Sequence, residues 1–360
     1  MEHSNRAAEI LDNLICPAFA VTDGVITGAN QAALQRGIQL NTNVWELITI
    51  GAQEYQQFTE GKLCITLSLQ GIPCDTTVTT FGTDHIFSLA SDYEDPELRA
   101  FSLAAQQLRG PLANAMINTE QLLPNVSVQD DTDAKQHLTQ LNRSLHQLLR
   151  AVSNMSDAAH YANRHTGSMQ TCSITGIFQE TLEKAAFLAS QASRTLHFTL
   201  PKQAVFGLAD AEKLERAVLN LISNAMKYAP TNGTVTATLR HSNGKLIFTV
   251  QDSGSGIDPQ VRNNVFSRFL REPGLEDSRS GIGLGMTIVR SVAAIHGGTV
   301  LMEQPENQGA RFTMTLAITQ NPDNVLRTPS LLRVDYAGGR DHSLLELSDM
   351  LPASLYENMD

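Results

Sequence analysis

The stretch "LERAVLNLISNAMKYAP" (residues 214–230) decides how the second half of the chain folds. Its apolar residues recur at steps of three and four, which predicts an amphipathic helix that ends before Pro230. Asn220 and Asn224 fall one helical turn apart on another face of that helix. The predicted buried stripe consists of Leu214, Val218, Leu221, Ile222 and Ala225.

The segments around this helix indicate an α/β unit over residues 169–320. Asn243 and Gly244 lie between two β-rich runs and predict a type I′ turn in a hairpin. A further helix is predicted around residues 287–295 and is followed by a glycine pair, which is a typical helix stop. The other predicted elements are a helix in "ITGIFQETLEKAAFLASQAS" and strands in "LHFTL", "TVLME" and "RFTMTLAI".

Asn220 and Asn224 are candidates for a magnesium site. Two neutral amide oxygens one turn apart can hold an ion that is otherwise bound to water and phosphate oxygens. The alternative is that both amides bond only the backbone or solvent, and the pair taken alone favours that alternative.

The segment "DSGSGID" (residues 252–258) adds a second feature. Asp252 is predicted at the end of a strand, followed by Gly254 and Gly256. A carboxylate in this position can accept a hydrogen bond from a purine amine, while glycine backbone closes around the ring.

The segment "SRSGIGLGMTIVR" (residues 278–290) adds a third feature at the entry to a helix. Free N–H groups and the positive end of the helix dipole suit phosphates at Gly281, Gly283 and Gly285. A Rossmann interpretation is disfavoured because no strand runs directly into these glycines. Each motif is weak alone, but the three in this order are specific.

Together these residues resemble the ATP-binding domain of sensor histidine kinases, a branch of the gyrase, chaperone and mismatch-repair ATPase superfamily. "NLISNAMKYAP" resembles the N box, "DSGSGID" the G1 box, "VFSRFLRE" the F box and "GIGLGMTIVRSVAAIHGG" the G2 box of that family. The resemblance covers residues 173–318. It implies a mixed sheet backed by helices, with ATP and Mg as cofactors and a mobile lid around residues 270–280.

The resemblance also implies residue roles. Asn224 corresponds to the magnesium ligand, Asn220 and Lys227 to phosphate contacts, Tyr228 to a neighbour of the nucleotide, and Asp252 to the residue that reads adenine. The hydrolases of the superfamily have a glutamate in the place of Asn220. An amide cannot act as a general base, so we expect slow or absent ATP hydrolysis.

Residues 91–168 predict an antiparallel helical hairpin, because two apolar seams with steps of three and four flank the break at Pro124. One hairpin buries little apolar surface, so two copies are expected to form a dimeric four-helix bundle, making the chain a homodimer. The first seam is Leu98, Phe101, Ala105, Leu108, Leu112, Ala115, Thr119 and Leu122, and the second is Leu138, Leu141, Leu145, Leu148, Val152, Met155, Ala159 and Ala162.

The first helix of this hairpin contains "AAQQLRGPLANAM" (residues 104–116). Gln106 and Gln107 follow a seam position and are expected to face solvent beside a kink at Pro111. The segment resembles the H box of the kinases, where a histidine and a glutamate precede Leu-Arg-x-Pro-Leu. Because an amide is neither a useful nucleophile nor a base, the usual autophosphorylation is expected to be lost.

Three functions are compatible with these motifs. The first is a histidine-kinase-like signalling protein that binds Mg-ATP, does not phosphorylate itself, and signals by conformation to a response regulator or partner kinase. The second is an active kinase that uses a partner's histidine or another acceptor of its own. The third is a serine kinase or ATPase of the same superfamily. The acceptor candidates are His137, His146, His160 and His165, of which the first two are expected to be exposed.

Residues 1–90 resemble a PAS sensor module, on the segment "VTDGVITGANQAA" with its Asp-Gly turn signal. Trp45 is expected in the core of this small α+β domain. Residues 321–360 are acidic and weakly periodic, and they are predicted to form a C-terminal tail or partner segment. The expected fold class is therefore multidomain α+β.

Composition narrows the class of protein. A length of 360 residues with 42% apolar content suits two or three compact units. The net charge of -11 makes nucleic acid a poor candidate partner. Four cysteines without C-x-x-C spacing indicate reduced thiols rather than a zinc site or disulfides. No apolar run reaches the roughly 18 residues of a membrane span, so we expect a cytoplasmic protein.

Overall fold

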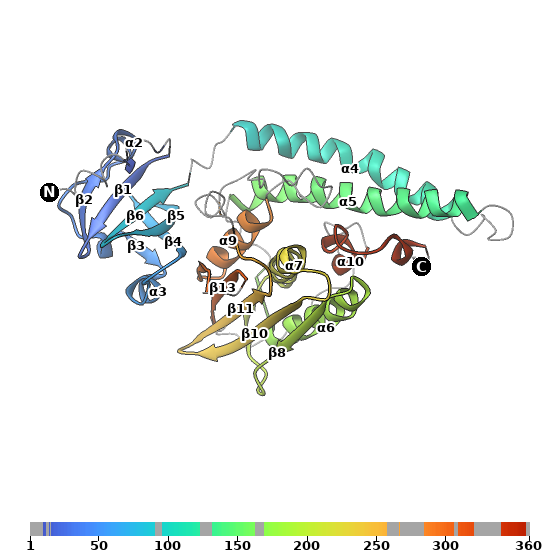
Figure 1. Ribbon diagram of the computed structural model, residues 1–360. Helices are drawn as coiled ribbons and strands as arrows, with labels where there is room; N and C mark the ends of the chain where they lie inside the picture. The colour runs from blue at the N-terminus through green and yellow to red at the C-terminus, as the bar shows by residue number, and fades with distance from the viewer. Residues whose placement is uncertain are drawn as a thin grey trace.

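The computed structural model describes residues 10, 11, 14, 16–90, 96–122, 132–162, 169–257, 266, 284–305, 309–319 and 340–357. These residues form an N-terminal β-rich unit, a pair of long helices, an α/β unit and a short C-terminal segment (Figure 1). The helix pair lies along one side of the α/β unit, and the C-terminal segment lies between the two.

The N-terminal unit is an antiparallel sheet with short helices. Asp23 and Gly24 connect its first two strands with φ values of 51° and 79°, which confirms the predicted turn. Phe19 and Phe87 stack in its core with ring centroids 4.9 Å apart. Its elements are β1 (Ala18–Thr22), β2 (Val25–Ala29), α2 (Gln31–Gln35), η1 (Val44–Glu46), β3 (Ile48–Ile50), α3 (Ala52–Gln56), β4 (Lys62–Leu69), β5 (Ile72–Phe81) and β6 (Asp84–Leu89).

The prediction that Trp45 is a core residue is wrong. Its side chain is 40% exposed. The indole ring covers the backbone of Gly24 and packs against Tyr55, with ring centroids 5.0 Å apart. Because glycine has no side chain, the indole can approach the backbone of the turn closely.

The two long helices are α4 (Pro96–Leu122) and α5 (Thr132–Ala162), which run antiparallel and side by side (Figure 1). Helix α4 continues through Pro111. The predicted seam of α4 divides into two parts: Ala105 and Leu112 are buried against α5, whereas Leu108 and Leu122 are 50% and 53% exposed.

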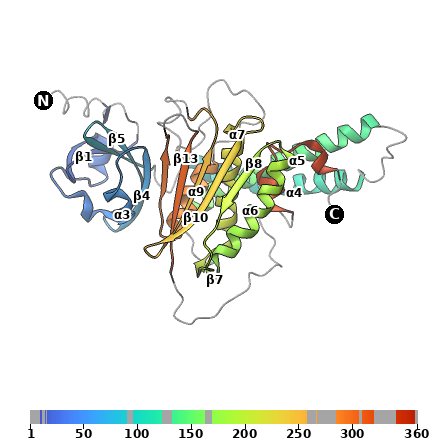
Figure 2. The ribbon, with the colours of Figure 1, turned by 60° about the horizontal axis from the view of Figure 1, so that its bottom comes forward.

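The α/β unit contains a mixed sheet with helices on one face (Figure 2). Strand β10 pairs parallel with β8 and antiparallel with β11, and Asn243 and Gly244 turn between β10 and β11 with φ values of 51° and 72°, as predicted. The elements are β7 (Gln170–Ser173), α6 (Ile174–Gln191), β8 (Thr195–Thr199), β9 (Phe206–Ala209), α7 (Ala211–Tyr228), β10 (Thr234–Ser242), β11 (Lys245–Asp252), α9 (Gly285–Ile295), β12 (Val300–Glu303) and β13 (Arg311–Ala317).

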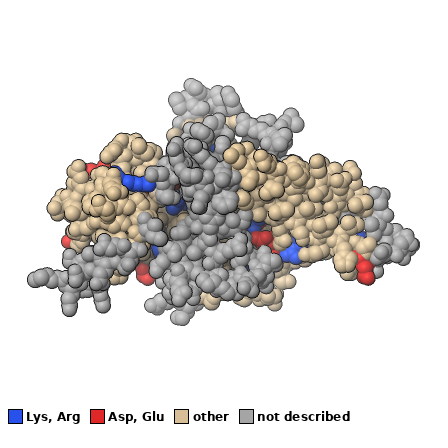
Figure 3. Space-filling view, turned by 90° about the horizontal axis from the view of Figure 1, so that it is seen from above, with Lys and Arg blue, Asp and Glu red and all other residues tan. Residues whose placement is uncertain are grey.

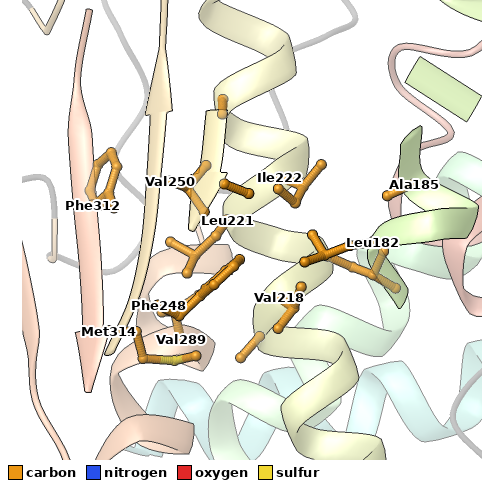
Figure 4. Packing of buried hydrophobic residues seen from close by; sticks show 14 of the residues in the cluster. Leu182, Ala185, Val218, Leu221, Ile222, Phe248, Val250, Val289, Phe312 and Met314 are labelled. Atoms are coloured by element: carbon orange, nitrogen blue, oxygen red, sulfur yellow. The ribbon is translucent and has the colours of Figure 1, made fainter. Parts of the chain in front are cut away.

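The core of this unit lies between the sheet and helices α6, α7 and α9 (Figure 4). The whole predicted stripe of α7 is buried there, from Leu214 to Ala225. Val218 and Leu221 point from α7 toward Phe248 on β11 (Figure 4). Burying each such leucine stabilises the fold by roughly 1.5–3 kcal/mol, so α7 is firmly held against the sheet.

The sheets of the N-terminal unit and the α/β unit are joined, which the sequence did not predict. Strand β12 pairs antiparallel with β4 over three residue pairs from Val300↔Cys64 to Met302↔Lys62. Beside this pairing, Lys245 Nζ lies 2.7 Å from Glu54 Oε1. The result is one continuous sheet that runs from β2 to β8.

The C-terminal segment is not a loose tail in its described part, residues 340–357. It contains α10 (His342–Glu346) and η3 (Ala353–Tyr356), and it contacts α5, α6 and α7. Leu347, Leu351 and Tyr356 are fully buried. Apolar residues lie between the acidic residues of this segment and form a buried side, which the acidic composition alone does not predict.

Candidate functional site

Helix α7 positions most of the predicted site residues. The Asp210 side chain accepts a hydrogen bond from the Lys213 amide at 3.2 Å and caps the start of the helix. The helix ends at Tyr228, where Ala229 becomes extended before Pro230, as the steric effect of proline on its predecessor requires. Asn224 and Lys227 therefore lie in the last two turns.

Asn220 lies in the interior, with 1% of its surface exposed. Its amide Nδ2 donates to the carbonyl of Arg216 at 2.9 Å and lies 3.5 Å from Oε2 of Glu346. Its Oδ1 faces the start of α9, where a Cβ on Gly285 would lie 2.6 Å away. A residue with a side chain at position 285 would therefore displace Asn220 or α9.

Asp252 ends β11 and is 5% exposed. Its Oδ1 accepts a hydrogen bond from the Gly254 amide at 2.8 Å. A Cβ on Gly309 would collide with the carboxylate, so only glycine fits beside it. Burial raises the pKa of the Asp252 carboxyl, and hydrogen bonds from the backbone of Gly254 and Ala310 act in the opposite direction.

The remaining described site residues on α7 lie in its last two turns. Asn224 and Lys227 are half-buried, and Tyr228 is exposed with the Lys227 ammonium 5.3 Å from the centre of its ring. Helix α7 contacts both α9 and β11. The carbonyl of Tyr228 at the end of α7 lies beside Gly254, just after β11, and Asn220 farther back on α7 lies beside Gly285 at the start of α9.

Several predicted features lie outside the described residues. These are Gly281, Gly283, the lid around residues 270–280 and the F box apart from Phe266. Gly254 and Gly256 are described, and both are half-buried after the end of β11.

The donor set suits a magnesium ion that takes most of its ligands from phosphate and water. Among the described residues, no cluster of three or more histidine, cysteine, aspartate or glutamate side chains could hold a metal. A half-buried Asn224 amide is the kind of single neutral ligand that Mg²⁺ uses when a nucleotide supplies the other oxygens.

The predicted acceptor positions lie on the helix pair. Gln106 and Gln107 are exposed on α4, as expected, and so is His137 on α5. The expectation that His146 is exposed is wrong: its ring is fully buried against Tyr356, with centroids 4.9 Å apart. The side chains of His160 and His165 lie outside the described part.

Burial lowers the pKa of the His146 imidazole, so the ring is neutral near pH 7. Its Nδ1 lies 2.9 Å from the carbonyl of Asn142 one turn earlier on α5. A ring buried between a helix and the C-terminal segment cannot reach a nucleotide without a rearrangement. Among the described candidates, His137 is therefore the only exposed histidine on α5.

Comparisons with known proteins agree with this geometry. Residues 209–320 match the family model described as "Histidine kinase-, DNA gyrase B-, and HSP90-like ATPase". The match spans α7, the end of β11 and the start of α9, which are the elements that meet at the site. The part of the chain that the family model matches therefore belongs to this ATPase family.

The chain has curated relatives that are much longer. It is 30% identical over 251 residues to hybrid signal transduction histidine kinase D of Dictyostelium discoideum, covering 67% of this chain and 16% of that protein. It is 29% identical over 235 residues to sensor protein QseC of Salmonella typhi, covering 65% of this chain and 51% of the relative. The chain thus spans about half the length of QseC and less of the hybrid kinase.

Solved structures similar to this chain include full-length ShkA in complex with AMPPNP. That chain is 25% identical, with a TM-score of 0.48 and coverage of 62% of this chain and 47% of the other. The mycobacterial sensor histidine kinase MprB is 28% identical, with a TM-score of 0.36 over 42% of this chain and 99% of the other.

Sequence patterns missed the residues that enclose the site. Gly309 precedes β13 and has no motif around it, although it packs on Asp252. Arg150, Arg216 and Glu346 form a buried ionic cluster beside Asn220. The run "LLELSDML" (residues 344–351) alternates apolar and acidic residues, and it was the one available signal that this segment has a buried side.

None of the helices in the described residues is both long and apolar enough to cross a bilayer.

Proposed function

We propose that this chain is a homodimeric, histidine-kinase-like signalling protein that binds Mg-ATP beside α7 and does not phosphorylate itself on α4. ATP would occupy the site, and Mg²⁺ would neutralise the charge of its phosphates. The chain's own residues bind and orient the nucleotide, and its output is a change in how the α/β unit and the helix pair dock. A response regulator or a partner kinase would read that change.

The observation that carries the proposal is the enclosure of Asp252. Burying a carboxylate is unfavourable unless hydrogen-bond donors face it, and the Gly254 amide is one such donor to Asp252. An exocyclic purine amine is a suitable donor for such a group. Gly309 packs so closely on Asp252 that any side chain there would collide with the carboxylate.

The other roles follow from position along α7. Asn224 would contribute its amide oxygen to Mg²⁺, and Lys227, the last residue but one of α7, would contact phosphate. Asn220, Gly281, Gly283 and Gly285 would complete the phosphate side. Tyr228, Gly254 and Gly256 would border the nucleotide.

The homodimer is supported by the exposed part of the α4 and α5 seams. Leu108 and Leu122 on α4 lie two heptads apart, and Leu141 and Leu148 on α5 lie one heptad apart, so each pair shares one side of its helix. These four leucines are 48–53% exposed. The described side chains on the face seen in Figure 3 include few charged ones. A second copy that packed on the four leucines would complete a four-helix bundle.

The second candidate function is an active kinase that uses a different histidine. The exposure of His137 on α5 is the observation that favours it. A serine kinase or plain ATPase is less favoured, because Asn220 stands where a general base is needed and its amide is already bonded to the backbone.

Incubation of the purified chain with γ-labelled ATP tests the proposal. We expect bound nucleotide and no acid-labile label on the natural chain, because Gln106 and Gln107 carry neither a nucleophile nor a base. The double variant Gln106→His with Gln107→Glu restores both groups on an exposed helix face, and we expect it to acquire acid-labile label.

The controls separate the alternatives. Gln106→Asn with Gln107→Asn keeps two amides at the same sites and should stay unlabelled. Acid-labile label on the natural chain that is lost in His137→Gln would establish the active-kinase alternative, and acid-stable label on a partner would establish the serine kinase. A chain that binds no adenine nucleotide in calorimetry would refute all three.

A further inference from the structure

The C-terminal segment, residues 340–357, contributes to two hydrophobic cores at once. Leu347, Leu351 and Tyr356 belong to the core of the α/β unit. Leu345 belongs instead to the core between α4 and α5, where it packs with Ala105 and its neighbours. Figure 1 shows α10 between the helix pair and the α/β unit. The C-terminal segment therefore joins the helix pair and the α/β unit through apolar contacts.

A buried ionic cluster accompanies these apolar contacts. Glu346 is fully buried, and its Oε2 accepts a hydrogen bond from Nε of Arg150 on α5 at 3.0 Å. Its Oε1 lies 3.2 Å from Nε of Arg216 on α7, which is also fully buried. One carboxylate thus neutralises two arginines from two different units. Such an arrangement is stable only while all partners are present, because a buried charge without a partner is strongly unfavourable.

Further contacts complete the two arginine sites. Arg150 donates to Ser223 Oγ on α7 at 3.0 Å and pairs with Asp349 of the C-terminal segment. Arg216 donates to Asn154 Oδ1 on α5 at 2.8 Å and pairs with Asp157. Each arginine therefore crosses from one unit to the other, and Glu346 lies between them.

The segment is also attached at its margins, away from the cluster. Arg340 Nη2 lies 3.1 Å from Glu120 Oε1 on α4, and His342 Nδ1 lies 2.6 Å from Glu215 Oε2 on α7. Asn142 on α5 donates to the carbonyl of Tyr356 at 3.0 Å. Residues of the C-terminal segment therefore contact helices α4, α5 and α7.

The same carboxylate lies beside a residue of the proposed site. Glu346 Oε2 is 3.5 Å from Nδ2 of Asn220, whose other acceptor is the backbone of Arg216. An Asn amide has two N–H donors, and here both face acceptors of the chain itself. A phosphate oxygen would have to replace the carboxylate, which also repels it as a like charge.

We propose that residues 340–357 are an intramolecular clasp, in which Glu346 locks α7 to α5 and competes with the phosphates of the nucleotide for the Asn220 amide. Glu346 is a positioning residue, because it acts through Asn220 and the two arginines. Release of the clasp frees Asn220 and lets the α/β unit move relative to the helix pair. The effect on nucleotide rests on the proposed function, whereas the locking of the two helices does not.

The variant Glu346→Gln tests the clasp, because it removes the charge and keeps the size of the side chain. We expect amide hydrogen exchange in α5 and α7 to become at least roughly tenfold faster where these helices face each other. We expect calorimetry to show ATP binding that is roughly three- to tenfold tighter, because a competing anion has been removed.

Glu357→Gln is the matched control. It makes the same charge change in the same segment, at an ion pair with Lys135 on the surface, where Nζ and Oε2 are 3.2 Å apart. Both measurements should equal those of the natural chain. If Glu346→Gln and Glu357→Gln behave alike in exchange and in affinity, the clasp is refuted.

The double variant Arg150→Met with Glu346→Met serves if Glu346→Gln does not fold. Apolar residues of similar size often replace a buried ion pair without loss of stability, and Arg216 keeps Asp157. We expect this double variant to bind ATP more tightly than the natural chain while its amide hydrogen exchange stays slow.

Unchanged or weaker affinity in both Glu346 variants refutes the competition for Asn220. If the natural chain binds no ATP, the proposed function fails, and exchange alone decides the clasp: faster exchange supports it and unchanged exchange refutes it.

Discussion

Helices α7 and α4 are both amphipathic, but their surroundings differ. Helix α7 is enclosed by the sheet, α6, α9 and the C-terminal segment, so even the polar Asn220 and the charged Arg216 are buried on it. Helix α4 packs mainly on α5 and exposes Gln106 and Leu108. On α7 even the polar Asn220 is buried and hydrogen-bonded, whereas on α4 the apolar Leu108 is exposed.

The difference shows which helix is complete within one copy of the chain. Every side of α7 has its partners in the described fold, and the site that it carries is assembled there. The uncovered leucines of α4 and α5 indicate that their surface is covered by something else, for which a second copy is the economical candidate.

The largest expected effect concerns the region around α7. Asp252→Asn replaces the acceptor for the purine amine by a group that also donates, and a site built for one hydrogen bond rejects the wrong partner strongly. We expect ATP affinity in calorimetry to fall about 100-fold or more. Asp23→Asn, at an exposed turn in the N-terminal unit, is the control and should bind ATP normally. Equal affinity in both variants would mean that adenine binds elsewhere.

The next effect concerns the open side of α4. Leu108→Asp places a charge in the proposed dimer interface, and we expect the dimer dissociation constant in analytical ultracentrifugation to rise at least tenfold, because burying an unpaired charge is unfavourable. Asn114→Asp adds the same charge at another exposed position of α4 and should leave the dimer intact. If the natural chain sediments as a monomer at all concentrations, the proposed dimer interface on α4 and α5 is refuted.

The smallest expected effect concerns the pH dependence of stability at the start of α7. His296 accepts a hydrogen bond at Nε2 from the Asp210 amide, 3.1 Å away, and its Nδ1 lies 2.8 Å from the carbonyl of Val292. Burial lowers the pKa of this imidazole from 6.5, so the unfolded chain takes up a proton that the folded chain does not. Stability is therefore full above about pH 6.5 and falls as the pH decreases through that value.

Urea unfolding at several pH values measures this effect. We expect the free energy of unfolding to decrease by about 1 kcal/mol for each unit by which the pKa is lowered. His146, whose pKa burial also lowers, should add to the same slope. His296→Gln should flatten the dependence, whereas His137→Gln on the exposed side of α5 should not. A slope that His296→Gln leaves unchanged would show that the histidine does not stay neutral in the fold.

Particular elements show how far sequence patterns reach. The bounds of α7 and the turn at Asn243 and Gly244 were predictable, because spacing and turn chemistry are local. The solvent-facing position of Gln106 followed from the same spacing. The burial of His146 did not, because the residue that covers it, Tyr356, lies far away in the sequence.

The sequence by itself determined the helices, the main turns, the order of the asparagine and glycine motifs, and the presence of Gln106 and Gln107 on an exposed side of α4. Only the tertiary structure decided that β4 continues the sheet of β12 and that Glu346 lies between Arg150 and Arg216. The physical reason is that periodicity records which side of an element is apolar, whereas the partner of a strand edge or a charge is chosen by distance in space.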